Sequence, residues 1–227
     1  MPTVGFDFDD TLVANPYGRL FYRPWVAARE AEAGVQAGTY LRKIAEIGRA
    51  YWRRGEWRRA FDWPAIAREE LGLIIPDPPP PNPEDVAALL RPGALDVLGF
   101  LLERGVDLAL VTNGLTAFQE PYLKALGWDR LFRQVVTPDQ VGTAKPDPRM
   151  FWAVKDLVLF VGDRPWHDTL VAKRAGVPAV MVGAGPLRED RHDPWGRAVD
   201  PDFRVDDLFG LLELFQSRPA AFPWLAS

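Results

Sequence analysis

The chain has 227 residues, of which 48% are hydrophobic and 26% charged, as in an ordinary globular protein with one large domain or a core plus a smaller domain. Its net charge of −4 gives no support for nucleic-acid binding through bulk electrostatics, so an anionic ligand needs a local positive site. The absence of cysteine excludes disulfides and thiol chemistry and fits a reducing compartment. No apolar run approaches the ~18–20 residues of a membrane span, and no signal peptide is visible. We therefore expect a cytoplasmic protein with no membrane or nucleic-acid partner.

The N-terminal stretch begins as a short apolar run, Val4-Gly5-Phe6, which is typical of a buried strand. Asp7 and Asp9 follow directly. Side chains two positions apart on a strand point the same way, so both carboxyls should face one pocket. Like charges at a buried strand end are unfavourable unless a cation or hydrogen bonds compensate them. The alternative interpretation is a solvated turn after an edge strand.

After the first strand the pattern becomes helical, and we predict an all-helical cap domain over residues 15–89. Apolar residues recur at helical spacing in three segments, 25–33, 40–52 and 65–71. The proline-rich stretch 76–83 cannot continue a helix and is typical of a stiff linker. The catalytic core is then expected to comprise residues 1–14 and 90–227.

From residue 84 onward apolar strands alternate with helices, which indicates a parallel sheet covered on both faces. The strands are expected at 107–111, 134–136, 157–161, 179–182 and 203–205. The helices are expected at 84–91, 94–103, 118–126, after Pro148, at 169–175 and at 208–215. We therefore predict an α/β fold, a doubly wound and mostly parallel Rossmann-like sheet core with an inserted all-helical cap domain. The stretch 186–202 is a polar loop of unknown purpose.

Polar residues that a hydrophobic core does not accommodate follow four of these segments. They are Asp7, Asp9 and Thr11; Thr112, Asn113 and Gly114; Lys145; and Asp163 with Asp168. In open α/β sheets ligands bind at the carboxyl ends of the strands, so the four groups should meet in one cleft. The collected acids would repel one another without a cation, and a hard divalent ion with oxygen ligands suits them.

Four motifs in this order resemble those of the haloacid dehalogenase superfamily. They are Asp-x-Asp-x-Thr at 7–11, Thr-Asn-Gly at 112–114, Lys-Pro-Asp-Pro at 145–148, and Gly-Asp with a second Asp at 162–168. The sequence is most similar to the phosphatases of that superfamily that carry a helical cap after the first strand. The resemblance implies a phosphoric monoester hydrolase that uses Mg²⁺ and acts on a small phosphorylated metabolite.

The resemblance also implies a role for each motif residue. Asp7 would be the nucleophile that forms an aspartyl phosphate, and Asp9 the general acid and then the general base. Lys145 would supply positive charge, and Asp168 would orient Lys145 or a metal-bound water. The implied Mg²⁺ ligands are Asp7, Asp9 (through its backbone carbonyl), Asp163 and Asp168. The implied substrate-binding residues are Thr11, Thr112, Asn113 and Gly114.

Structural interpretations of the same residues remain open. Thr112 can end a strand by bonding its own backbone, and Lys145 can be a solvated loop residue. Asp163 and Asp168 can cap a helix that starts near Pro165. His167 is interpreted as a surface residue at a helix start. From Lys145 to Asp163 is 163 − 145 = 18 positions, which predicts a crossover helix of about two turns and bears on the placement of Lys145.

The cap offers candidates for contacting a second anionic group of the substrate, although an arginine run on a helix is usually a solvated face. These candidates are Arg19, Tyr22, Arg23, Arg49, Trp52, Arg53 and Arg54. Other functions also remain open: a 2-haloacid dehalogenase, which the resemblance disfavours because Asp9 is present, a phosphomutase, or a non-catalytic binding module that keeps the fold. The sequence determines neither the substrate nor the oligomeric state.

Overall fold

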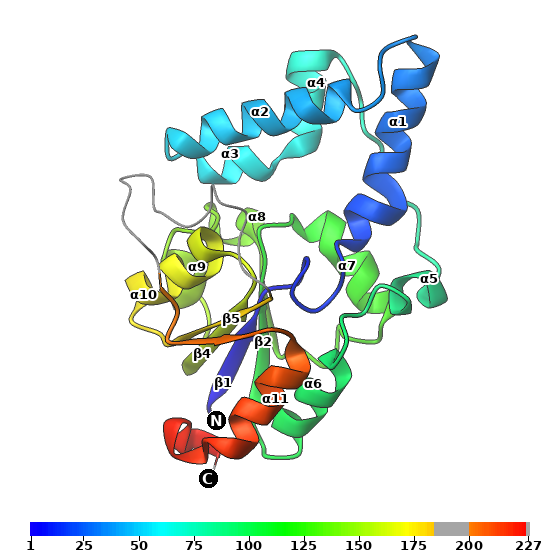
Figure 1. Ribbon diagram of the computed structural model, residues 1–227. Helices are drawn as coiled ribbons and strands as arrows, with labels where there is room; N and C mark the ends of the chain where they lie inside the picture. Colours follow the sequence, from blue (N-terminus) through cyan, green and yellow to red (C-terminus); the bar gives the residue numbers. More distant parts are fainter. Residues whose placement is uncertain (184–199, 226–227) are drawn as a thin grey trace.

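The protein is described by a computed structural model that covers residues 1–183 and 200–225 (Figure 1). A six-stranded sheet in the order β3-β2-β1-β4-β5-β6 lies at its centre, and every neighbouring pair is parallel. The strands are β1 (Thr3–Phe6), β2 (Asp107–Val111), β3 (Gln134–Val136), β4 (Leu157–Gly162), β5 (Ala179–Val182) and β6 (Phe203–Val205). The chain first adds β2 and β3 on one side of β1. It then adds β4, β5 and β6 on the other side. The predicted α/β fold class is confirmed; most of the predicted loop 186–202 lies outside the described residues.

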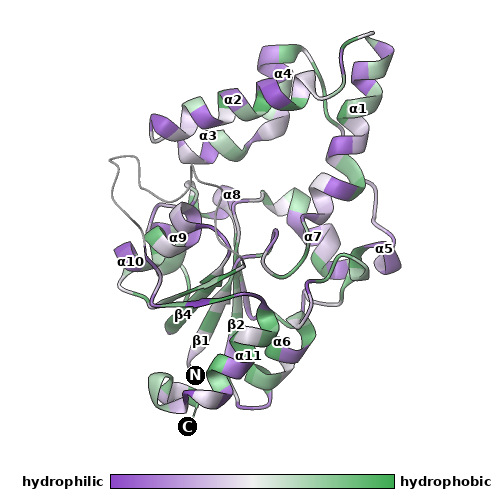
Figure 2. Cartoon of the chain, in the orientation of Figure 1, coloured by the Kyte–Doolittle hydropathy of each residue, from purple (hydrophilic) through white to green (hydrophobic). Residues whose placement is uncertain are grey.

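Both faces of the sheet are covered by helices, which explains why its strands carry almost no polar positions. Leu108 and Leu110 of β2 pack in one hydrophobic cluster with helices α6 (Ala94–Leu102), α7 (Thr116–Ala125) and α11 (Leu208–Ser217). Ala109 and Val111 pack in a second cluster with α9 (Arg149–Trp152) and α10 (Leu170–Ala175). The strands are accordingly apolar along most of their length, whereas the cap helices alternate polar and apolar residues (Figure 2).

The segment that follows β1 forms a helical cap over the carboxyl edge of the sheet (Figure 1). It consists of the π-helix η1 (Tyr17–Tyr22), α1 (Arg23–Glu32), α2 (Thr39–Arg53), α3 (Trp57–Phe61) and α4 (Trp63–Leu71). Residues 72–82 contain no helix or strand, and α5 (Pro83–Ala87) leads back to the core. The outgoing and returning chains meet there, since Ala14 N–H donates to the Leu89 carbonyl at 2.8 Å. The domain boundaries at 14/15 and 89/90 stay predictions.

Aromatic rings join the cap to the core. Trp52 of α2 stacks on Trp166, and their ring centroids are 4.9 Å apart. Trp166 lies in the helical turn η2 (Pro165–Thr169), which follows β4. His167 of the same turn meets the edges of Phe61 at 5.4 Å and Trp52 at 5.9 Å. The interpretation of His167 as a surface residue holds only in part: it lies in the turn that begins this helical segment, but the cap rings leave it half-buried, and burial lowers its pKa to about 3.

Short elements depart most from the sequence-based expectations. The crossover helix α9 has four residues, about one turn instead of two, because Lys145 and Asp163 are so close in sequence. Two short helices, α3 and α8 (Pro138–Val141), were not expected at all. The C-terminal tail forms two 3₁₀ turns, η4 (Pro219–Ala221) and η5 (Pro223–Leu225), and Phe222 between them packs on Phe215.

Candidate active site

The carboxyl ends of β1, β2 and β4 bring the sequence-predicted polar residues together. Asp7 directly follows β1, Thr112 follows β2, and Asp163 follows β4. These three strands are neighbours in the sheet, so residues more than 150 positions apart meet: the Thr11 hydroxyl lies 3.2 Å from Asp7 Oδ2 and 3.3 Å from Asp163 Oδ1. All the predicted groups are therefore at one edge of the sheet, below the cap.

Lys145 is the cation at the centre of this site. Its side chain is 1% exposed, and Nζ donates to Asp7 Oδ1 at 2.7 Å and to Asp168 Oδ1 at 2.6 Å. Burial alone would lower the pKa of Lys145, but the two carboxylates outweigh it and the pKa is raised. The short span to β4 therefore does not displace Lys145 from the site, and the solvated-loop interpretation of this residue is wrong.

Asn113 holds the loop that carries Lys145. Its Oδ1 accepts from the Lys145 backbone N–H at 2.7 Å, and its Nδ2 donates to the Lys145 carbonyl at 3.2 Å. This paired contact occupies the Asn113 side chain, so a phosphate-binding role is left to its backbone. The neighbouring Thr112 Oγ1 accepts from the Gly114 N–H at 3.0 Å, the local backbone bond that sequence reasoning had kept open.

Asp7, Asp163 and Asp168 form a compact acidic cluster. One carboxylate oxygen of each lies within 4.8 Å of the others. Gly162 permits this arrangement, because a Cβ at that position would overlap the Asp168 carboxyl. Burial raises the pKa of Asp7 to about 6, against the opposing effect of Lys145, and burial together with Asp168 and Asp7 raises that of Asp163 to about 8.

The residues present fit a hard divalent cation. Of the three clustered carboxylates, Asp7 and Asp168 pair with the buried ammonium of Lys145. Among the described residues, the other cation in contact with the cluster is Arg164, whose Nε lies 3.3 Å from Asp163 Oδ2. Burial, together with the mutual repulsion of the acids, raises the pKa values of Asp7 and Asp163. Oxygen ligands at this spacing are those that Mg²⁺ and similar ions prefer. The Asp9 carboxyl is not part of the cluster, and a contribution through its backbone carbonyl stays a prediction.

Asp9 has a different environment. Its Oδ2 accepts from Gln119 Nε2 at 2.9 Å, and its Oδ1 is buried without a partner in the described residues. Burial and the nearby Asp7 raise the pKa of Asp9 to about 7, a suitable value for proton transfer near neutral pH. Gln119 was not found from the sequence, because a single glutamine in a helix carries no signal of its own.

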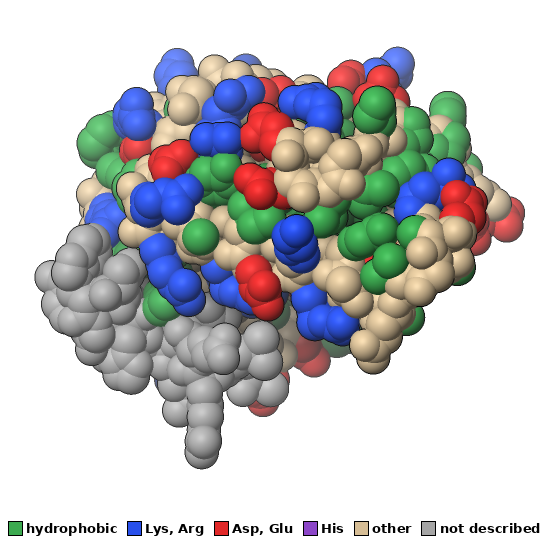
Figure 3. All heavy atoms as spheres, turned by 90° about the horizontal axis from the view of Figure 1, so that it is seen from above, with side chains coloured by type: hydrophobic (Ala, Val, Ile, Leu, Met, Phe, Trp, Pro, Cys, Tyr) green, Lys and Arg blue, Asp and Glu red, His purple; other side chains and the backbone are tan. Residues whose placement is uncertain are grey.

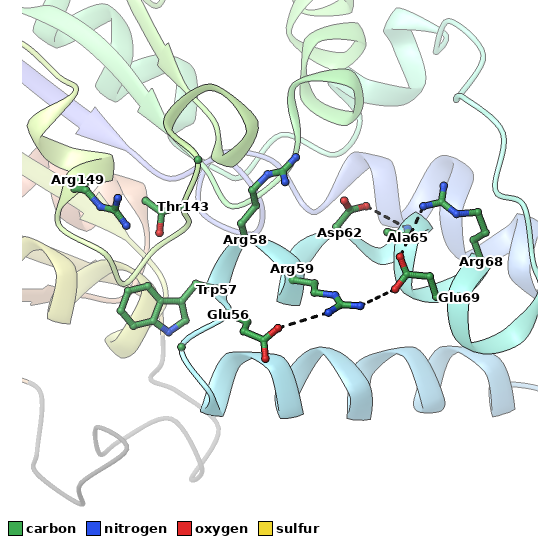
Figure 4. Close-up of a pocket in the computed structure, with 12 residues that line it drawn as sticks. Glu56, Trp57, Arg58, Arg59, Asp62, Ala65, Arg68, Glu69, Thr143 and Arg149 are labelled. Carbon is green, nitrogen blue, oxygen red and sulfur yellow. Dashed lines mark hydrogen bonds and ion pairs between the residues drawn. The ribbon is translucent and has the colours of Figure 1, made fainter.

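A groove of about 510 Å³ separates the cap helices α3 and α4 from the core loop around Thr143 (Figure 4). Its charged lining residues are Glu56, Arg58, Arg59, Asp62, Arg68, Glu69 and Arg149. Arg59 pairs with Glu69 at 2.8 Å and Arg149 with Asp147 at 2.6 Å, whereas Arg58 extends into the space between cap and core with no ion-pair partner among the described residues. Viewed from the cap side, the molecule intersperses basic and acidic side chains (Figure 3).

None of the seven cap candidates from the sequence is among the residues that line this groove. Trp52 and Tyr22 are buried in aromatic contacts, the latter stacked near Tyr17 and Trp63. Arg54 pairs with Glu56 and lies over the Tyr51 ring. The remaining arginines are exposed, as expected of a solvated helix face. The groove arginines of the cap lie on α3 and α4, of which the sequence had predicted only α4, and Arg149 lies on α9 of the core.

The fold and this acidic, lysine-containing site define a Rossmann-like α/β core with a helical cap. Residues 1–176 match the family model of haloacid dehalogenase-like hydrolases. Residues 143–211 match a second family model, which is also described as haloacid dehalogenase hydrolase-like. The chain belongs to the haloacid dehalogenase-like hydrolase family. The predicted superfamily is thereby confirmed, and the full-length relatives described next confirm the predicted enzyme class, a phosphoric monoester hydrolase.

Relatives of full length support the assignment. A phosphoglycolate phosphatase of Rhodospirillum rubrum is 31% identical over 97% of this chain and 96% of its own length. A glyceraldehyde 3-phosphate phosphatase of Methanopyrus kandleri is 32% identical over 92% of this chain and 94% of its own length. The crystal structure of a phosphatase of the family from Thermococcus onnurineus has a TM-score of 0.68 at 21% identity, covering 95% of this chain and 98% of that one. Among the helices described here, none is long and apolar enough to cross a membrane.

Proposed function

We propose that the protein is a Mg²⁺-dependent phosphatase that hydrolyses a small phosphomonoester through a phosphorylated Asp7. The observation that carries this proposal is the convergence of one carboxylate oxygen each of Asp7, Asp163 and Asp168 within 4.8 Å of one another, with the buried ammonium of Lys145 bound to Asp7 and Asp168. Asp7, Asp163 and Asp168 are the side chains that would hold Mg²⁺. When bound, the ion would neutralise charge between these acids and the substrate phosphate.

The residues of the site supply the two chemical steps. First, an Asp7 oxygen forms a bond to phosphorus while the bond from phosphorus to the ester oxygen breaks, and Asp9 gives that oxygen its proton. Then Asp9 takes a proton from water, whose oxygen attacks phosphorus, and the bond to Asp7 breaks with release of phosphate. Lys145 attracts the phosphate and keeps Asp7 ionised, and Thr112 with the backbone N–H groups of this loop would hold phosphate oxygens.

Small anionic esters are the substrate class that the site supports. The cap excludes bulk water from the acids through the Trp52–Trp166 stack, which favours compact substrates that fit beneath it. Most groove arginines are paired with acids, so Arg58, which has no ion-pair partner among the described residues, is the candidate to meet a second negative group of the substrate. The names of the full-length relatives put 2-phosphoglycolate and glyceraldehyde 3-phosphate first in a screen.

The test is a panel of phosphorylated metabolites assayed for phosphate release with Mg²⁺ and with EDTA. We expect Mg²⁺-dependent turnover, and a loss of at least ~10³-fold for Asp7→Asn because the nucleophile is removed. Protein quenched in acid during turnover should carry one phosphoryl group on Asp7 by mass spectrometry.

The matched control is Asp10→Asn. Asp10 is outside the acidic cluster, pairs with Arg91 at 3.5 Å, and has a left-handed backbone (φ 67°) that asparagine tolerates well. This variant should keep wild-type turnover. No cleavage of any ester with any divalent ion, or wild-type rates for Asp7→Asn, would contradict the proposal.

A further inference from the structure

Gln119 is buried between helix α7 and the acids at the end of β1. Its side chain is 2% exposed, and Nε2 donates to Asp9 Oδ2 at 2.9 Å. In the described part of the chain, the Asp9 carboxyl accepts no other hydrogen bond, and its Oδ1 is buried without a partner. One oxygen of the proposed acid–base group is therefore held and the other is free.

The local structure is built to place this amide. Gln119 lies in the early part of α7, just after the Thr112-Asn113-Gly114 turn. Gly114 leaves the necessary space, because a Cβ there would overlap the Gln119 amide. The adjacent Phe118 stacks on Tyr17 of η1 at 4.5 Å, which fixes α7 against the base of the cap. A buried amide is unfavourable unless it is hydrogen-bonded, and Asp9 is the partner that satisfies its N–H.

We propose that Gln119 is a positioning residue that orients the Asp9 carboxyl for proton transfer, an inference that rests on the proposed phosphatase function. An amide N–H needs an acceptor, so its bond to Oδ2 makes Oδ2 the carbonyl oxygen of the protonated acid and puts the proton on Oδ1. The same bond restricts rotation about Cβ–Cγ. Oδ1, which has no protein partner, is then the atom that gives its proton to the leaving oxygen.

The importance of this proton depends on the leaving group. An aliphatic alkoxide is a strong base and leaves readily only when it is protonated, whereas 4-nitrophenolate leaves as an anion. Misorienting the acid should therefore slow cleavage of an alkyl phosphate and spare cleavage of 4-nitrophenyl phosphate. A residue needed only for packing would affect both esters alike.

The test compares phosphoryl transfer from glycerol 3-phosphate, in single turnover, with the pre-steady-state burst of 4-nitrophenolate. Both report cleavage of the ester bond before water attacks the phosphorylated enzyme. Gln119→Met keeps the length of the side chain and removes the donor, and we expect about 10²-fold slower alkyl cleavage with less than a ~3-fold change in the burst. Gln216→Met, the same change on the exposed side of α11, should alter neither rate.

The outcomes separate the inference from the proposed function. Equal slowing of the two esters by Gln119→Met, or no slowing of either, overturns the positioning role while the phosphatase assignment stands. Wild-type protein that cleaves no ester of the metabolite panel and neither of these two esters overturns the assignment and the inference together. If Gln119→Met does not fold, Gln119→Asn, which keeps an amide too short to reach Asp9, carries the same expectation.

Discussion

Removing the buried ammonium of Lys145 should destabilise the metal-free protein by an amount that depends on pH. Lys145→Met keeps most of the aliphatic volume but leaves the carboxyls of Asp7 and Asp168 without their partner at 2.7 and 2.6 Å. A buried acid without a partner binds a proton instead of staying charged. Because Asp7 already has a pKa of about 6 beside Lys145, its complete protonation in the variant costs about a further 1.4 kcal/mol at pH 7 and almost nothing at pH 5.

Urea denaturation of wild type and variant in EDTA, at both pH values, measures these losses in the free energy of unfolding. Lys124→Met is the matched control: its ammonium pairs with Glu120 at 2.6 Å on an exposed helix face, and we expect no loss beyond experimental error. A Lys145→Met loss below ~1 kcal/mol at pH 7, or equal losses at the two pH values, would refute the reasoning, since broken buried pairs typically cost about 3–5 kcal/mol.

The remaining predictions concern the acids, the cap and the groove. Because the strand-end carboxyls have raised pKa values and bind protons more tightly folded than unfolded, the metal-free protein should lose thermal stability as pH rises from about 4 to about 8. Mg²⁺ should raise the melting temperature more at pH 8 than at pH 5, and a melting temperature independent of pH in EDTA would contradict this. Trp52→Ala removes the stack on Trp166 and should lower kcat/KM up to about tenfold by weakening cap closure, while Trp152→Ala, on the exposed side of α9, should not. Arg58→Ala should raise KM about tenfold for esters with a second acidic group but not for neutral ones, and an equal effect from Arg53→Ala on the outer face of α2 would argue against a role of the groove.

Much of the core was predictable because its signals are local. The apolar runs of β2, β4 and β5 had to be strands buried on both faces, and the polar residues after β1, β2 and β4 had to lie at the carboxyl ends of those strands. Asp7 and Asp163 could thus be expected at one edge before any coordinates were known. Lys145 was harder to place, since it follows no strand of its own, and its position depends on the Asn113 side chain holding its loop.

Residues whose role depends on a distant partner could not be predicted. Gln119 matters because α7 turns its side chain toward Asp9, and Arg58 because α3 faces the core, and neither pattern is visible in the residues alone. His167 was interpreted as exposed because nothing nearby in sequence covers it, and the rings of Trp52 and Phe61 do so from the cap.

The sequence by itself determined the kind of fold, the family resemblance and the acids and lysine of the site, because periodicity and strand-end chemistry act over a few neighbouring residues. Only the tertiary structure decided which oxygen of Asp9 is free, which arginine faces the groove and how the cap rests on the loop after β4. Those features arise from packing between segments far apart in the chain, where small differences in distance and burial determine which polar groups are satisfied.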